Sequence, residues 1–232
     1  MAKAASFSGF HPSAIQFLDE LTSHNNRDWF QKNKSRYESD VLEPALAFVE
    51  SMQKPLATIS KHFVAVPKRT GGSLMRIYRD TRFSNDKTPY KTNVGIHFRH
   101  EKGKDVHAPG YYLHISPEEC FLGCGIWHPE SKALAKIRKT IDKDQAGWKR
   151  AAMSKAFLNL FEMHGESLKR PPKGYKAEHP LIDELKRKDF IGLTPISFDD
   201  LFDPKLPKAI ASKLKKGTPM MKFLCGALNL KF

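Results

Sequence analysis

Hydrophobic residues in the first third of the chain recur every three or four positions, which is the spacing of one face of an α-helix. The segment HPSAIQFLDEL predicts a first helix with Ser13 as its cap. The segment NNRDWFQKNKSRYE predicts a short second helix, and apolar positions between Tyr37 and Met52 predict a longer third one. Pro44 lies inside this third helix, so we expect a kink or a break there.

From about residue 73 the hydrophobic period changes to two, which is typical of β-strands with one apolar face. The segments SLMRIYRD, NVGIHFRH, YYLHIS and CFLGCGIW predict four successive strands. SNDKTP and EKGKDVHAPG are rich in turn residues, and SPEE predicts a tight hairpin turn. Short connections of this kind favour an antiparallel meander.

After Pro129 the helical period returns. It predicts a basic amphipathic helix that contains Leu134, Ile137, Arg138 and Ile141, and a second helix from about Trp148 to Phe161. Shorter helices are predicted at 180–188, 198–202, 205–215 and 219–229. The sequence therefore predicts an α+β fold, with an antiparallel β-meander at about residues 73–127 between N-terminal and C-terminal helices. We expect residues 1–232 to form a single domain.

The charge is strongly positive. The 39 Lys and Arg residues exceed the 25 Asp and Glu residues, which gives a net charge of +14. Residues 131–155 carry eight basic and two acidic side chains, and residues 204–232 carry seven basic and no acidic ones. Such a balance favours an anionic partner, such as nucleic acid or a nucleotide, although a positive surface can also serve solubility alone.

The three cysteines, Cys120, Cys124 and Cys225, are too few for a disulfide framework. Their spacing does not match a zinc site, and we predict no cofactor. The N-terminus lacks the continuous apolar run of a secretory signal, and no segment approaches the roughly 18 apolar residues of a membrane span. These features predict a soluble, cytoplasmic protein without a membrane partner.

The segment RIYRDTRFSNDKTPYK, residues 76–91, contains five basic and two acidic side chains. Short polar residues in its loop, Ser84, Asn85 and Thr88, could surround a phosphate with hydrogen-bond donors. The loop is not a P-loop, because the glycine and lysine spacing of that motif is missing. Asp86 could equally pair with a neighbouring cation and hold the hairpin in place.

If the strands pair as a meander, polar side chains project together from one face of the sheet. These side chains are Arg76, Tyr78, Asp80, His97, Arg99, Tyr112 and His114. Guanidinium groups that converge can bind phosphate or carboxylate, because each offers a planar fork of donors. The alternative is an ordinary exposed face with weak ion pairs.

Four segments, FLDELTSHNNRDWFQKNKSRYE, RIYRDTRFSNDKTPYKTN, YYLHISPEECFLGCGIWHP and RPPKGYKAEHPLIDELKRKDF, together resemble the uncharacterised family DUF2461. The resemblance extends from about Phe10 to the C-terminal helix, and its most specific part is residues 76–91. It implies one soluble α+β domain at about residues 10–230 and assigns no catalytic residue. Cys124 stands where the family pattern favours a small residue such as glycine, which argues against a required thiol there.

We hypothesise that a basic sheet face and its loop bind a phosphate-bearing ligand, a nucleotide or nucleic acid. The candidate binding residues are Arg76, Arg79, Asp80, Arg82, Lys87, Lys91, His97 and His114. One alternative is a metal- or base-assisted phosphoester hydrolase, with Asp80, His97 and His114 as conceivable metal ligands. Another is an interaction protein that docks an acidic partner. For nucleic acid, stacking platforms could come from Tyr111, Tyr112 and Trp127.

Overall fold

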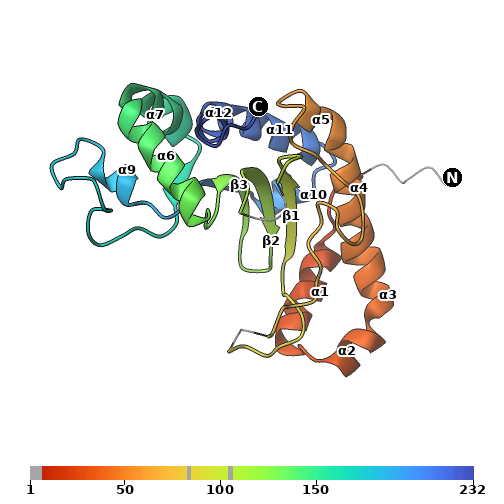
Figure 1. Ribbon diagram of the computed structural model, residues 1–232. Helices are drawn as coiled ribbons and strands as arrows, with labels where there is room; N and C mark the ends of the chain where they lie inside the picture. Colours follow the sequence, from red (N-terminus) through yellow and green to blue (C-terminus); the bar gives the residue numbers. More distant parts are fainter. Residues whose placement is uncertain (1–6, 83–84, 104–106) are drawn as a thin grey trace.

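The computed structural model describes residues 7–82, 85–103 and 107–232. Helices precede and follow a central sheet, as Figure 1 shows. The N-terminal elements are α1 (Pro12–Ser23), α2 (Arg27–Lys32), α3 (Lys34–Arg36), the π-helix η1 (Tyr37–Leu42), α4 (Glu43–Ser51) and α5 (Gln53–Ala57). The strands are β1 (Val94–Arg99), β2 (Gly110–Ile115), β3 (Cys120–Ile126), β4 (Glu162–His164) and β5 (Phe190–Pro195). The remaining helices are α6 (Ser131–Lys143), α7 (Gln145–Ala152), α8 (Lys155–Leu158), α9 (Ile182–Lys186), α10 (Phe198–Phe202), α11 (Leu206–Lys216) and α12 (Thr218–Ala227).

The N-terminal helices follow the predicted order, with two local differences. The cap of α1 is His11, whose Nδ1 accepts a hydrogen bond from the N–H of Ser13 at 3.2 Å, so the prediction of Ser13 as cap is wrong. The irregularity expected at Pro44 takes the form of the π-helix η1, which ends two residues before it. Proline has no N–H for the carbonyl four residues earlier, and a wider π turn leaves room for its ring.

The sheet has the order β1-β2-β3-β5-β4, and every neighbouring pair is antiparallel. The three consecutive strands β1, β2 and β3 confirm the predicted meander. The turn SPEE joins β2 to β3, and the Ser116 hydroxyl closes it by accepting the N–H of Glu119 at 3.1 Å. β4 and β5 were not predicted. They come from distant parts of the chain, and β5 pairs with the free edge of β3.

The segment predicted as the first strand lies beside β1 but is not a regular strand, which corrects the prediction. It pairs with β1 through the bridge Leu74↔Ile96, and a second bridge joins Tyr78 to Tyr90. Between the two bridges lie residues 75–77 on one side and residues 91–95 on the other, so the ladder is interrupted. Leu74 and Ile77, three residues apart, are both buried, which strict alternation does not allow.

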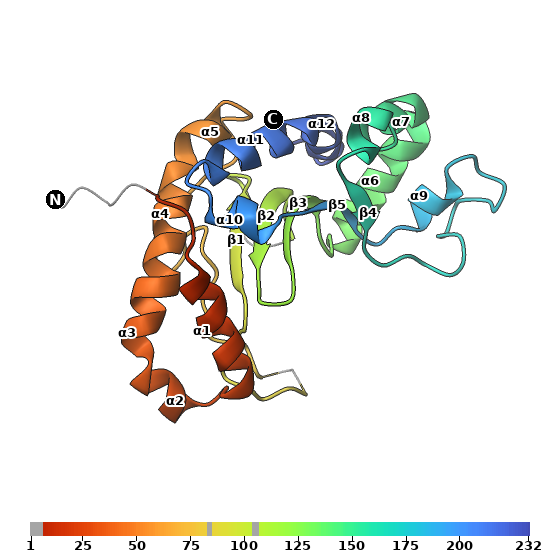
Figure 2. The ribbon, with the colours of Figure 1, turned by 180° about the vertical axis from the view of Figure 1, so that it is seen from behind.

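The two faces of the sheet differ. On one face Phe98 of β1 packs near Phe48 of α4, with ring centroids 6.4 Å apart, and α12 packs against β3. Figures 1 and 2 both place α1 to α5 on the β1 side, α6 to α9 on the opposite side, and α11 and α12 between them. The other face carries half-buried polar and aromatic side chains such as Tyr112, His114 and Phe121.

Across the residues that the structure describes, no helix combines the length and the apolar character of a membrane span.

Candidate functional site

A cavity of about 380 Å³ lies on the polar face of the sheet. Its lining residues come from the strands and from loops beside them: Met75, His97, Ala108, Gly110, Tyr112, His114, Phe121, Gly123, Cys124, Gly125, Trp127, Ile191 and Leu193. Ligand sites in proteins have volumes of roughly 300–1,000 Å³, so this cavity has room for a small molecule.

Glycines open this cavity. Gly123 lies between Tyr112 of β2 and Leu193 of β5, and a Cβ atom there would lie 3.0 Å from the end of Leu193 and 3.8 Å from Tyr112, so the lack of a side chain leaves space on this face. Gly110 serves a second purpose, because a Cβ atom there would lie 2.2 Å from Nε2 of His97. The imidazole of His97 therefore lies over Gly110 on the neighbouring strand. Tyr112, Phe121 and Trp127 contribute rings to the walls of the cavity.

The polar wall of the cavity is formed by Tyr112 and His114. The Tyr112 hydroxyl lies 3.3 Å from Nδ1 of His114, and Nδ2 of Asn93 lies 3.5 Å from the same nitrogen. Burial raises the pKa of Tyr112 to about 12, so its hydroxyl keeps its proton. Burial also lowers the pKa of His114, which favours the neutral imidazole. Because the amide nitrogen of Asn93 can only donate, Nδ1 of His114 is an acceptor, so the Tyr112 hydroxyl donates to it and His114 carries its proton on Nε2.

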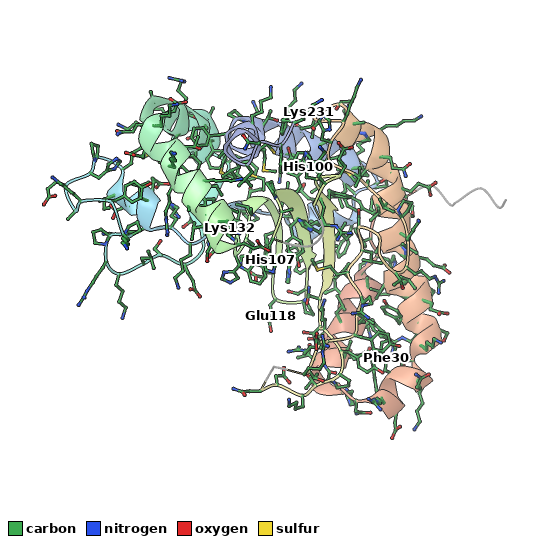
Figure 3. The ribbon with its side chains drawn as sticks, in the orientation of Figure 1. Phe30, His100, His107, Glu118, Lys132 and Lys231 are labelled. Atoms are coloured by element: carbon green, nitrogen blue, oxygen red, sulfur yellow. The ribbon has the colours of Figure 1, made fainter. Side chains whose placement is uncertain are left out.

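Aromatic rings complete the walls. The imidazole of His114 stacks on Phe121, with centroids 4.6 Å apart and ring planes 2° from parallel. At the rim, the indole of Trp127 is 48% exposed and stacks against the ring of His107. Figure 3 labels His107 in this region and Glu118 in the β2–β3 turn. An exposed indole beside a cavity can contact a ligand directly.

Two arginines of the 76–91 segment are paired with carboxylates of the same segment. Arg82 forms a two-point ion pair with Asp80, through Nε at 3.0 Å and Nη2 at 2.7 Å. Arg79 pairs with Asp86, and this bond holds the hairpin in the way the sequence allowed. These contacts neutralise much of the charge that was predicted to bind an anion.

The loop of the same segment also uses its donors internally. The ammonium of Lys87 donates to the carbonyl of Thr81 at 2.8 Å. Both the N–H and the hydroxyl of Thr88 donate to Asp86. Ser84 lies outside the described residues. In the described part of the loop, these donors are therefore already hydrogen-bonded to acceptors of the same loop.

A smaller cationic cluster remains beside this loop. Lys91 is half-buried, and its pKa is lowered by burial and by the nearby charges of Arg76 and Arg79. Among the described residues Lys91 has no carboxylate partner at ion-pair distance. Nε of Arg79 is buried and, within the same part of the chain, lacks a hydrogen-bond acceptor. Arg76, Arg79 and Lys91 together form this cationic cluster.

The structure divides the eight predicted binding residues into three groups. His97 and His114 line the cavity, and Arg76, Arg79 and Lys91 form the cationic cluster. The other three, Asp80, Arg82 and Lys87, are exposed in the loop. Met75 and Asn93 connect the first two groups, because Met75 precedes Arg76 and lines the cavity, while Asn93 follows Lys91 by two residues and contacts His114.

Other candidate residues take different places. Tyr111 is fully buried in the core, so it cannot serve as a stacking platform. Asp80, His97 and His114 do not gather as metal ligands; within the described ranges, no three His, Cys, Asp or Glu side chains lie close enough to hold an ion. The sequence reasoning missed Met75, Gly110, Gly123 and Leu193. The glycines at alternate positions of β3 were the available signal.

The chain belongs to the conserved hypothetical protein family DUF2461. The model of this family matches residues 13–223, which is most of the chain and includes the whole sheet. No curated protein and no solved structure matches the chain. The resemblance noted in the sequence is thereby confirmed. Membership of DUF2461 assigns no activity, and the cavity and the cationic cluster are the features that bear on function.

Proposed function

We propose that this DUF2461 protein binds a small phosphate-bearing ligand, such as a nucleotide. In this proposal the cationic cluster holds the phosphate. The observation that carries the proposal is Lys91, a half-buried ammonium beside two guanidinium groups with no carboxylate of its own among the described residues. Keeping like charges together under partial burial is unfavourable without an anion. A phosphate would supply the missing charge and accept charge-assisted hydrogen bonds.

The cavity supports a ligand with an organic part as well as a phosphate. It is concave, small and mostly apolar, with a few polar groups on one wall, which is the usual composition of a small-molecule site. Met75 lines the cavity and Asn93 contacts His114, and both are close in sequence to the cationic cluster, so the proposal places one ligand across both. A compact site of this kind favours a nucleotide over a long nucleic acid, which would follow an extended basic groove.

The basic helices give less support to nucleic acid than their sequence suggested. Arg138 of α6 donates to the backbone carbonyls of Leu185 and Arg187, at 2.7 and 3.0 Å, so it acts inside the fold. Ile210 and Leu214 in the basic C-terminal region are fully buried. Phosphoester hydrolysis is also less favoured, since the predicted metal ligands are apart. Among the described residues, no surface formed by the fold specifically supports docking of an acidic protein.

The proposal includes a cytoplasmic location. Cys120, Cys124 and Cys225 are all buried and free. Burial raises the pKa of each thiol, and those of Cys124 and Cys225 reach about 12. A protein whose cysteines are all unpaired is suited to a reducing compartment, where nucleotides are abundant.

The test is isothermal titration with AMP, ATP and inorganic phosphate. We expect the substitution Lys91→Met to weaken binding of the phosphate-bearing probes by about tenfold or more, because it removes one charge-assisted contact. Arg82→Met is the matched control, since Arg82 is 76% exposed in its side chain and already paired with Asp80. It should change affinity less than about twofold. Equal effects of both variants, with the fold intact, would overturn the proposal, as would absence of binding by all three probes.

A further inference from the structure

The cavity on the sheet face has a shape and a chemistry of its own. Gly123 contributes no side chain to the cavity, and Tyr112, Phe121 and Trp127 line it with rings. We infer that the cavity receives an uncharged heteroaromatic ring with an N–H donor on its edge, the base of a nucleoside. This inference rests on the proposed function only for the attached phosphate.

The missing side chain at Gly123 favours a flat ligand. Gly123 lines the cavity between Tyr112 and Leu193 and adds no side chain to it. A planar ring can occupy the space that this leaves while its faces and edges contact the aromatic walls. The volume of about 380 Å³ fits one ring system with its sugar better than a long chain.

The lining decides the charge of the ligand part inside. Among the described residues that line the cavity there is no Asp, Glu, Lys or Arg side chain. The neutral His114 and the protonated Tyr112 add no full charge. A phosphate placed there would lose its hydration without a counter-charge, which is costly. The ring therefore lies in the cavity and the phosphate stays at the cationic cluster.

The Tyr112 oxygen provides the hydrogen-bond selectivity. Its proton is used toward Nδ1 of His114. A phenolic oxygen has two lone pairs, so it can still accept a donor from the ligand. The cavity should therefore prefer a ring that presents an amino group or a ring N–H over one that presents only acceptors.

An alkyl chain would fit this wall poorly. It would bring no donor to the Tyr112 oxygen, and it would not stack on the aromatic walls. Methyl octanoate, which is uncharged and has no hydrogen-bond donor, is therefore a useful negative probe. Its binding in place of nucleosides would identify the cavity as a lipid site and overturn the inference.

The experiment measures binding of adenosine, guanosine, cytidine and uridine, which carry no phosphate, by titration calorimetry and by quenching of Trp127 fluorescence. Trp127→Phe assigns the quenching, because Trp29 and Trp148 remain in that variant. At least one nucleoside should bind. Gly123→Val should weaken it by about tenfold or more, because the added side chain takes up volume of the cavity. Gly226→Ala is the matched control, since a Cβ atom there meets nothing within 4 Å.

A second comparison tests the hydrogen bond. Adenosine should bind several-fold more tightly than purine riboside, which lacks only the amino group, and the difference should disappear in Tyr112→Phe. If nucleotides and inorganic phosphate bind through Lys91 while no nucleoside binds and Gly123→Val has no effect, this inference is wrong and the proposed function stands. If nucleosides bind and phosphate adds nothing, the phosphate site is wrong and the ring site stands.

Discussion

The buried carboxylate of Asp189 accepts the backbone N–H of His128 at 2.7 Å. His128 has a φ angle of +44°, a conformation that non-glycine residues rarely adopt. The second oxygen of Asp189 accepts the N–H of Glu166 at 2.8 Å. The carboxylate of Asp189, directly before β5, thus holds the backbone directly after Trp127, a residue at the rim of the cavity.

Substitution Asp189→Asn should lower the free energy of unfolding by about 1–3 kcal/mol. The amide keeps the size of the side chain, but it offers only one oxygen for two backbone donors and leaves one part-buried N–H without this acceptor. Urea denaturation followed by circular dichroism measures the change. Asp183→Asn is the control, because the side chain of Asp183 is 89% exposed. A loss below about 0.5 kcal/mol for Asp189→Asn would show that the carboxylate does not hold this turn.

His114 should make stability depend on pH below neutrality. Burial lowers its pKa in the folded protein below the ordinary value of 6.5, although Glu118 and Glu119 oppose this shift. Below pH 6.5 the unfolded chain therefore binds a proton that the folded protein does not. Stability should be complete above pH 6.5 and should decrease as the pH falls, by at most about 1.4 kcal/mol per pH unit from this group.

The measurement compares urea denaturation of the protein with that of His114→Phe at pH 7.5, 6.5 and 5.5. The phenylalanine ring can still stack on Phe121 and does not titrate. We expect the variant to lose less stability between pH 6.5 and 5.5. His164→Gln, at an exposed histidine of β4, controls for unrelated titration. A slope in His114→Phe as steep as in the parent protein would contradict the prediction.

The fold was predictable wherever a local pattern decides it. In β1 and β2 the alternating residues each face one layer, so Ile96 and Leu113 are buried while Tyr112 and His114 reach the cavity. β5 escaped prediction because its pairing with β3 joins residues about 70 positions apart, as in Phe121↔Pro195. Nothing local in such a short segment distinguishes a strand from a loop.

The site was predictable only in part, for a related reason. Alternation correctly placed His97 and His114 on one face with Tyr112. It could not show that Arg82 is paired with Asp80, because side-chain pairing within a loop depends on the turn and not on the period. The cavity itself depends on Gly123 and on Leu193 of the unpredicted β5. The glycines of β3 are visible in the sequence, but the space beside Gly123 depends on its pairing with Leu193 of β5.

Arg138 should contribute more to stability than its neighbour on the same basic helix. Its guanidinium donates to the carbonyls of Leu185 and Arg187 and so attaches α6 to the end of α9. Arg138→Met should lower the free energy of unfolding by about 2–4 kcal/mol, because two charge-assisted hydrogen bonds are lost. Lys139→Met, at the adjacent exposed position, should cost less than about 0.5 kcal/mol. Equal values in urea denaturation would mean that Arg138 is a surface cation like the others.

Cys124 and Gly217 should be energetically coupled. A Cβ atom on Gly217 would lie 2.8 Å from Sγ of Cys124, whereas its next neighbours, Leu214 O and Cys124 Cβ, are at 3.4 and 3.5 Å. Gly217 has a φ angle of −78°, so alanine is free of backbone strain there. Gly217→Ala should therefore cost about 1–3 kcal/mol through overpacking against the sulfur alone.

The coupling is measured by a double-mutant cycle. In a Cys124→Ala background the sulfur is absent, and Gly217→Ala should cost less than about 0.5 kcal/mol, because only ordinary contacts remain. Thermal and urea denaturation of the four proteins give the interaction free energy. The same cost in both backgrounds would place the clash elsewhere, in the backbone of α11. The predicted result would show that the missing side chain of Gly217 leaves room for the sulfur of Cys124 beside α12.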